Sequence, residues 1–297
     1  MSSLKISNLS KVYPNGVHAL NNVSLEISKG MFGLLGPNGA SKSSLMRTVA
    51  TLQEADSGSV YLGDLNVMEN PTELRKVLGY LPQEFGVYPR ITASQLLDHM
   101  AVLKGVTNGR ERKELVKYLL NKVNLYRQRD KSVKSFSGGM KQRVGIAQAL
   151  IGNPQLIIVD EPTAGLDPGE RNRFYNLLAE VGEDVVVILS THIVDDVREL
   201  CTDMAIMNHG QIVYNGSPLT VLDDLAGMVW QKQIERNELE AYNENYMVIS
   251  NKMVAGKPQI HILSNDDPGD GFMAVAPNLE DVFFTKISQS SQATVEA

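Results

Sequence analysis

The fold is decided by the stretch Met31-Phe32-Gly33-Leu34-Leu35-Gly36-Pro37-Asn38-Gly39-Ala40-Ser41-Lys42-Ser43. Its first five residues predict a buried apolar strand, and residues 43–52 have the apolar spacing of a helix. A glycine-rich loop between a strand and a helix is typical of a phosphate site, because backbone N–H groups of the loop and of the helix N-terminus attract anions. The loop residues expected to hold a nucleotide are Gly36, Pro37, Asn38, Gly39, Ala40, Ser41, Lys42, Ser43 and Ser44.

Side chains of this loop predict the contacts to the phosphates. Lys42 is expected to reach the β and γ phosphates, the Ser43 hydroxyl to bind Mg²⁺, and Ser44 to add a hydrogen bond. Ser41 departs from the pattern, since the residue before the lysine is normally glycine. If position 41 needs a left-handed backbone, serine costs roughly 1–2 kcal/mol, which a folded domain can absorb. Taken alone, the loop is also compatible with a glycine-rich turn that binds no ligand.

The rest of the first 222 residues predicts an α/β architecture. Two apolar runs, Leu156–Val159 and Val185–Leu189, flank a helical pattern over Arg171–Val181. A strand, a crossover helix and a second continuous apolar strand predict a parallel sheet covered on both faces. Alternating stretches within residues 4–27 predict further strands, and the pattern between about Pro89 and Ala149 is mostly helical.

The composition changes near Asp223 and predicts a different kind of segment. Residues 231–245 are polar and charged, as in a helix or linker, and three short strand-like runs follow within residues 247–275. Leu279–Ile287 predicts a short helix, and Ser288–Ala297 is expected to be a disordered end.

The length predicts a main domain and a smaller one, because 297 residues exceed what one core usually organises. We expect an ATPase-type domain over residues 1–222, with a helical subdomain at about 88–150. Residues 223–297 are expected to form a small α+β accessory domain.

Composition and charge exclude several classes of protein. The 43% hydrophobic and 21% charged residues are ordinary for a globular chain and exclude a disordered one. A single cysteine, Cys201, excludes an internal disulfide and a cysteine-cluster zinc site. The net charge of −6 and the lack of a Lys/Arg run indicate no nucleic-acid partner. Apolar runs fall short of the about 20 residues that span a bilayer, so a role at a membrane would require a second chain to cross it.

Two further motifs carry possible chemistry. The run Leu156–Val159 ends in Asp160 and Glu161, where a first acid can hold the water shell of Mg²⁺ and a second can orient an attacking water. Ser137, Gly138 and Gly139 open a helical pattern and offer a second anion cradle. Each motif alone is common, since acids end many strands and Ser and Gly mark ordinary turns.

Taken in order, these residues resemble the ATP-binding subunit of an ABC transporter, over about residues 2–220. The matches to the family's motifs are Tyr13 for the aromatic that stacks on adenine, residues 36–44 for the Walker A loop, Gln83 for the Q-loop glutamine, Ser137–Met140 for the signature, Asp160 and Glu161 for Walker B and its catalytic glutamate, residues 164–167 for the D-loop, and His192 for the switch histidine.

The resemblance implies a P-loop NTPase fold with a mixed core sheet, an N-terminal antiparallel β subdomain and a helical subdomain. It implies ATP and Mg²⁺ as cofactors and ATP hydrolysis as the activity. The residues that it implicates are Glu161, His192, Lys42 and Gln83 for catalysis; Tyr13, residues 36–44, Ser137, Gly138 and Gly139 for ATP; and Ser43, Gln83 and Asp160 for the metal.

The same resemblance implies partners and a location. ATP is shared between the Walker A loop of one subunit and the signature of another, so the chain is expected to form a dimer, either with itself or with a different ATPase subunit. The segment Pro277–Phe284 is similar to the end of ATPases that serve ABC-2 type exporters. We therefore expect a peripheral subunit on the cytoplasmic face of the membrane, bound to a separate permease through residues 83–90.

Three alternatives stay open at this point. Ser41 is compatible with a nucleotide-binding regulatory subunit that turns over weakly. An importer ATPase would share the same motifs. A soluble ABC ATPase that acts on ribosomes or DNA is disfavoured, because such proteins usually join two ATPase halves or insert a long arm.

Overall fold

The computed structural model describes residues 3–83, 86, 90–163 and 166–295 of the chain. In this part of the chain the central sheet has the strand order β10-β9-β3-β8-β7-β6. Its neighbouring strands run parallel except β10, which pairs antiparallel with β9, so the expected mixed sheet is confirmed. The strands are β3 (Gly30–Leu35), β6 (Leu78–Leu81), β7 (Leu156–Asp160), β8 (Val186–Thr191), β9 (Asp203–Asn208) and β10 (Gln211–Gly216).

The central strands are apolar along most of their length because both faces of the sheet are covered. Alternate side chains of β7 enter two different cores: Leu156 and Ile158 join one, and Ile157 and Val159 join the other. Helices that pack against this sheet include α1 (Lys42–Val49), α2 (Pro71–Val77), α6 (Pro168–Gly182) and α7 (Val194–Leu200). The predicted parallel sheet with two covered faces is therefore confirmed.

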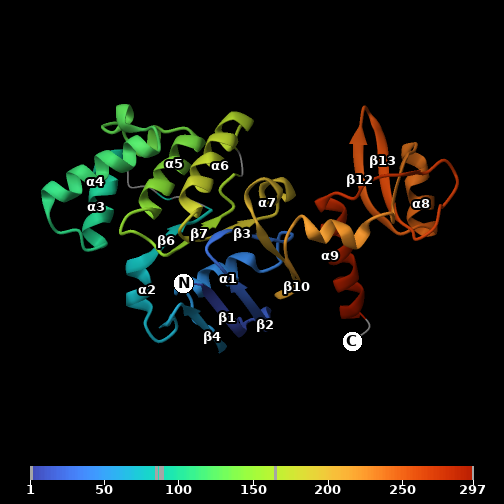
Figure 1. Cartoon of the computed structure of the whole chain (residues 1–297), viewed down its shortest axis with the longest axis horizontal. Coiled ribbons are helices and arrows are strands. Elements are labelled where there is room, and N and C mark those ends of the chain that lie inside the picture. Colours follow the sequence, from blue (N-terminus) through green and yellow to red (C-terminus); the bar gives the residue numbers. More distant parts are fainter. Residues whose placement is uncertain (1–2, 84–85, 87–89, 164–165, 296–297) are drawn as a thin grey trace.

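Two further groups of elements complete the first 222 residues. An antiparallel sheet in the order β2-β1-β4-β5 contains β1 (Leu4–Val12), β2 (His18–Ile27), β4 (Ser57–Leu62) and β5 (Leu65–Asn66). The predicted helical region contains α3 (Ala93–Leu103), α4 (Gly109–Lys122) and α5 (Gly138–Ala149), with 3₁₀ turns at Tyr126–Gln128 and Val133–Ser135. In Figure 1 these helices lie at one end of the molecule, away from β12, β13 and α8.

The last 75 residues form a sheet in the order β12-β13-β11-β14 and two helices. The elements are β11 (Val229–Gln233), α8 (Leu239–Asn245), β12 (Val248–Val254), β13 (Lys257–Leu263), β14 (Met273–Ala274) and α9 (Leu279–Val295), with 3₁₀ turns at Thr220–Leu225 and Arg236–Glu238. Part of the stretch expected to be a helix or linker, residues 231–233, is therefore strand.

The C-terminal helix corrects a second expectation. Ser288–Ala297 was expected to be disordered, but α9 continues from Leu279 to Val295. The helix packs against α7, β9 and β10, and the Asn208 amide donates a hydrogen bond to Ser290 Oγ at 2.7 Å. Val282 is fully buried within the larger of the two main cores. Tertiary packing, which the polar sequence of the last residues does not reveal, extends this helix.

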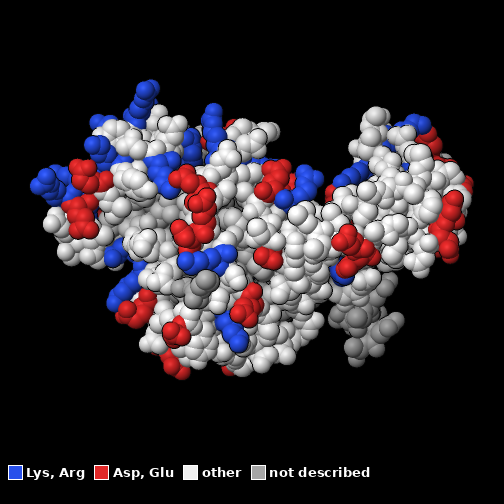
Figure 2. Space-filling model, viewed as in Figure 1, with Lys and Arg blue, Asp and Glu red and all other residues white. Residues whose placement is uncertain are grey.

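Charged side chains show no large field of one sign on the face drawn in Figure 2. Lys and Arg are interspersed with Asp and Glu over the helical region, and much of the remaining surface is uncharged. This distribution agrees with the absence of a Lys/Arg run in the sequence. In the part of the chain that the structure describes, no helix is long and apolar enough to cross a membrane.

Candidate functional site

Three loops meet where the parallel strands β3, β7 and β8 end. Strand register brings Leu35 beside Thr191 and Asp160 beside Ser190. The N–H of Gly36 then donates to the Thr191 carbonyl at 3.3 Å, and the N–H of Glu161 donates to the Ser190 carbonyl at 2.8 Å. In open α/β sheets ligands bind outside these carboxyl ends.

The phosphate loop has the backbone that its glycines allow. A Cβ at Gly36 would lie 2.4 Å from the Met207 carbonyl oxygen, so only glycine fits there. Gly39 and Ser41 both have left-handed φ angles, of 84° and 77°. Position 41 therefore does require a left-handed backbone. Serine adopts this conformation at a cost, whereas glycine adopts it readily. Ser41 is also the N-cap of α1, but its side chain makes no capping hydrogen bond.

Lys42 is buried at the floor of the loop, with 5% of its surface exposed. Its ammonium donates to the carbonyls of Gly36 at 2.7 Å and Pro37 at 3.2 Å, and its Nζ lies 3.7 Å from Glu161 Oε1. Burial lowers the pKa of Lys42, an effect that the nearby carboxylates of Glu161 and Asp160 oppose. The charge of this lysine is therefore costly until further negative charge reaches it.

Glu161 is the residue on which the candidate catalytic side chains converge. Gln83 Nε2 donates to Glu161 Oε2 at 2.9 Å, and His192 Nδ1 lies 3.3 Å from Glu161 Oε1. Glu161 itself has a left-handed φ of 46°, an uncommon backbone for glutamate. Strained backbone of this kind is often found at functional sites. The structure thus brings together all four residues that the sequence implicated in catalysis.

A hollow of about 430 Å³ contains most of these groups. It is lined by Asn38, Gly39, Ala40, Ser41, Lys42, Ser43, Ser44, Gln83 and Glu161. Residues from the phosphate loop, from the end of β6 and from the end of β7 therefore face one space, which matches the predicted nucleotide site. His192 is 40% exposed beside it.

The expected metal ligands fit a hard divalent cation. Ser43 and Gln83 offer oxygen atoms at the hollow, and Asp160 follows at the end of β7. Asp160 is 3% exposed, and its Oδ1 atom has no hydrogen-bond partner among the described residues. A buried carboxylate oxygen without a partner is costly, and oxygen ligands are those that Mg²⁺ prefers. The donor set is thus suited to Mg²⁺.

Tyr13 lies beside the loop through its hydroxyl group. The hydroxyl is 3.0 Å from Ser44 Oγ and donates to Gln53 Oε1 at 3.2 Å. Gln53 also donates to the Ser44 carbonyl at 2.9 Å and so braces α1. Tyr13 is therefore near the phosphate loop, and its stacking on adenine stays a prediction.

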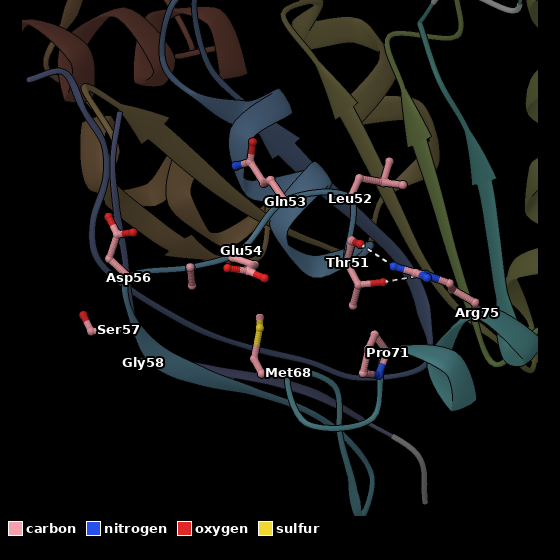
Figure 3. A pocket seen from close by; sticks show the side chains of 11 residues that line it. Thr51, Leu52, Gln53, Glu54, Asp56, Ser57, Gly58, Met68, Pro71 and Arg75 are labelled. Carbon is pink, nitrogen blue, oxygen red and sulfur yellow. Dashed lines mark hydrogen bonds between the residues drawn. The ribbon is translucent and has the colours of Figure 1, made fainter. Parts of the chain in front are cut away.

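A second hollow, of about 500 Å³, lies at the other end of α1. Figure 3 shows Arg75 pointing at Thr51, to which it donates from Nε to Oγ1 at 3.1 Å and from a terminal nitrogen to the carbonyl at 2.9 Å. Gln53 lines this hollow as well. None of the predicted site residues lines it, so we do not assign the nucleotide there.

The signature residues do not line the hollow at the phosphate loop. Ser137 is the N-cap of α5 and its Oγ accepts from the Met140 N–H at 3.3 Å. Gly138 and Gly139 are the first residues of that helix, and a Cβ at Gly139 would lie 2.5 Å from Glu170 Oε2. Within one chain the two predicted halves of the ATP site are thus separate, as expected if a second subunit completes each site. Residues 164–165 of the D-loop lie outside the described residues, and Asp167 caps α6 by accepting from the Glu170 N–H at 2.9 Å.

Sequence reasoning missed one buried carboxylate near the site, Asp196. It accepts hydrogen bonds from the hydroxyls of Thr163, Thr191 and Tyr175. A signal was available, because Asp196 shares a helix face with Ile193 and Leu200 at spacings of three and four residues. An acid on an apolar helix face has to find buried partners.

Comparisons with known proteins agree with this fold and site. The family described as "ABC transporter" matches residues 20–164. The solved structure of the ATP-binding cassette MJ0796, a dimer in a post-hydrolysis state bound to ADP and Pi, has a TM-score of 0.66 and 27% identity; the match covers 72% of this chain and 98% of that one.

Relatives by sequence carry the same class of description. The probable multidrug ABC transporter ATP-binding protein YbhF of Escherichia coli is 38% identical over 66% of this chain, which spans only 34% of that protein. The daunorubicin/doxorubicin resistance ATP-binding protein DrrA of Streptomyces peucetius is 30% identical over 92% of this chain and 84% of its own length. The methionine import ATP-binding protein MetN 1 of Acinetobacter baylyi is 32% identical over 80% of this chain and 69% of its own length.

The fold and the site define a P-loop ATPase of the ATP-binding cassette class. The chain belongs to the family of ABC transporter ATP-binding proteins. The resemblance found in the sequence, and the fold that it implied, are confirmed.

Proposed function

We propose that this chain is the ATP-hydrolysing motor subunit that powers export through a separate transmembrane permease. The observation that carries the proposal is the single hollow onto which Lys42, Ser43, Gln83 and Glu161 converge. This set combines an anion-binding loop, a buried cation, oxygen ligands for Mg²⁺ and a carboxylate for water. Phosphoryl transfer to water requires those parts together.

Each residue has a role in the proposed reaction. Loop N–H groups and Lys42 bind the β and γ phosphates, while Ser43, Gln83 and Asp160 would hold Mg²⁺. The metal, when bound, neutralises charge that develops on the phosphate oxygens. Glu161 accepts a hydrogen bond from the attacking water and orients it, and His192 contacts the γ-phosphate.

We propose that a second ATPase subunit completes each site. Ser137, Gly138 and Gly139 would bind the γ-phosphate held by the partner's Walker A loop, in a homodimer or a heterodimer. The separation of signature and phosphate loop within this chain supports that arrangement, and the related cassette MJ0796 was solved as a dimer. Because ATP would contact both subunits, it would favour the closed dimer and drive a change of shape.

The direction of transport is the finer part of the proposal. DrrA, which aligns with 92% of this chain, is described as a resistance protein, and this supports export. MetN 1 is described as an import protein, so the ATPase core alone does not distinguish the two directions. We further propose a peripheral location on the cytoplasmic face and a permease contact at residues 83–90. Residues 84–85 and 87–89 of that contact lie outside the described residues.

We also propose that residues 1–222 and 223–297 form an ATPase domain and an accessory domain. The separate sheet of β11–β14 and its small core around Ile234, Ile260, Ile262 and Phe272 support a second unit.

The test is Mg-ATP hydrolysis by the purified chain, with particle size measured in parallel for Glu161→Gln plus ATP. We expect turnover in the parent, a loss of about 10²–10⁴-fold in Glu161→Gln, and an ATP-trapped dimer of that variant. Glu180→Gln is a matched control, because Glu180 is an exposed partner of Lys122 outside the site. Near-normal turnover in Glu161→Gln would refute the catalytic assignment. A parent without turnover or dimer would favour the regulatory alternative that the left-handed Ser41 suggests.

A further inference from the structure

The end of β7 and the end of β8 are joined by one buried carboxylate. Thr163, two residues after Glu161, donates from Oγ1 to Asp196 Oδ2 at 2.6 Å. Thr191, the residue before His192, donates from Oγ1 to the same oxygen at 2.9 Å. Asp196 Oδ2 is therefore a direct bridge between the segments that carry the two candidate catalytic side chains.

The bridge is buried, and both oxygens of the carboxylate accept hydrogen bonds. Asp196 is 0% exposed, and Thr163 and Thr191 are each 1% exposed. The other oxygen, Oδ1, accepts from the Tyr175 hydroxyl on α6. Asp196 forms no ion pair among the described residues, so these three hydroxyls are its protein partners there. Hydrogen bonds to a buried carboxylate are stronger than neutral ones, and removing a partner is costly.

The protonation state of Tyr175 agrees with its role as a hydrogen-bond donor to Asp196. Burial, and then the hydrogen bond to Asp196, raise the pKa of Tyr175 well above its usual value. The phenol therefore keeps its proton at physiological pH and donates a hydrogen bond to Asp196 Oδ1. Nearby charged groups are Arg171 on α6 and Glu199 on α7, whose fields act on Tyr175 in opposite directions.

The bridge also shapes the backbone at the switch histidine. Thr191 Oγ1, while donating to Asp196, accepts from the Ile193 N–H at 3.0 Å. A turn is thereby closed around His192, which lies between the two residues. On the other side, the Thr163 carbonyl accepts from the Leu166 N–H at 3.2 Å. Thr163 and Thr191 thus each make a backbone hydrogen bond as well as a hydrogen bond to the same carboxylate.

We propose that Asp196 is a positioning residue that fixes the separation of the two strand ends, so that Glu161 and His192 face the same γ-phosphate. This inference rests on the proposed function, because it takes Glu161 and His192 as the groups that act on the nucleotide. Asp196 itself does not line the hollow that holds Lys42 and Glu161. Its effect is expected on the rate of the chemical step and not on the affinity for ATP.

The test removes one hydroxyl at a time with little change of volume. Thr163→Val and Thr191→Val are each expected to lower kcat about tenfold to a hundredfold, since small displacements of reacting groups have effects of that size. KM and the Kd for ATP are expected to stay within about twofold, because the residues that hold the phosphates are unchanged. The double variant should lose less than the product of the single losses, since both changes break one bridge.

Tyr175→Phe is the matched control. It takes one donor from the same carboxylate but breaks neither link to a catalytic segment, so kcat should stay within about twofold even if the free energy of unfolding falls. Parental kcat in both threonine variants, or an equal loss in Tyr175→Phe, would overturn the proposal.

A second measurement does not depend on turnover. Hydrogen exchange of the Ile193 amide should accelerate in Thr163→Val, although the hydrogen-bond partner of this amide is Thr191 and not Thr163, and should be unchanged in Tyr175→Phe. If the parent chain does not hydrolyse ATP, the proposed function fails. The exchange measurement then tests on its own whether Asp196 couples the two strand ends. Equal exchange in Thr163→Val and the parent would then contradict it.

Discussion

Nζ of Lys42 lies 3.7 Å from Oε1 of Glu161, and both side chains are largely buried where β3 and β7 end. The structure thus places the main candidate cation and the main candidate base of the site almost in contact. Burial nevertheless lowers the pKa of Lys42, so desolvation outweighs the attraction of the two acids.

The lowered pKa of Lys42 predicts a pH dependence of ATP binding. As the pH rises through this pKa, below the ordinary 10.5, the lysine loses its charge and the affinity for ATP should fall. The sign for stability is opposite, because between the lowered pKa and 10.5 the unfolded chain binds more protons, and this group then makes the folded state more stable as the pH rises. Calorimetric titration with ATP from pH 7 to 10.5 measures the affinity. Lys42→Arg is the control, since arginine stays charged over this range and should bind ATP, more weakly, with little pH dependence. If both proteins had the same pH profile of ATP affinity, deprotonation of Lys42 would not be the cause of the fall in affinity.

Ser41→Gly should stabilise the chain. Relief of the left-handed serine gains roughly 1–2 kcal/mol, and the greater freedom of glycine in the unfolded chain offsets part of it, which leaves about 0.5–1 kcal/mol. Affinity for ATP should be retained or raised. Ser41→Ala separates the backbone from the hydroxyl, because alanine keeps the left-handed cost and loses only the side-chain oxygen. Urea unfolding and ATP titration measure both effects. A clear drop in ATP affinity in both variants would show that the Ser41 hydroxyl contributes to binding.

Motif residues could be predicted from the sequence because their order along the chain is informative. The motifs predict Lys42, Gln83, Glu161 and His192 as site residues, and the apolar runs that precede Lys42, Glu161 and His192 predict three of the central strands. Asp196 belongs to none of these motifs; the pattern of α7 marks it as an acid on an apolar face, but its partners are hydroxyls 5 and 33 residues away that meet it only in the folded chain. The strand at residues 229–233 was missed for a similar reason, since its polar side chains find their partners only in the folded chain, Gln231 with His261 and Lys232 with Asp270.

Cys201 should be inert in the folded protein. It is 8% exposed, and burial raises the pKa of its thiol, with a further contribution from the nearby Asp196. The thiolate is the reactive form, so iodoacetamide at neutral pH should modify the native chain far more slowly than the chain in denaturant. Mass spectrometry follows the single adduct, because the sequence contains one cysteine. Equal rates with and without denaturant would contradict the burial of this thiol.

Deleting residues 223–297 should destabilise the remaining chain. Leu279, Val282 and Phe283 belong to the same core as residues of α7 and β9, and a fully buried apolar side chain contributes about 1.5–3 kcal/mol. A loss of several kcal/mol is therefore expected in thermal or denaturant unfolding. A chain that ends after Ile287 is the control: it keeps these three residues and loses the Asn208–Ser290 hydrogen bond, worth about 1 kcal/mol. Parental stability in the long deletion would show that the two proposed domains are independent.

The packing of α9 has a consequence for synthesis on the ribosome. Strands β3, β7, β8 and β9 are all translated before residue 210, yet part of the core beside them is closed by Val282 and Phe283, from a helix that is translated about 70 residues later. Until that helix emerges from the ribosome, the nascent ATPase core exposes an apolar surface and is prone to aggregate. Completion of this core therefore waits until α9 has been translated, and the stretch of translation between α7 and α9 is the period in which this protein depends most on chaperones.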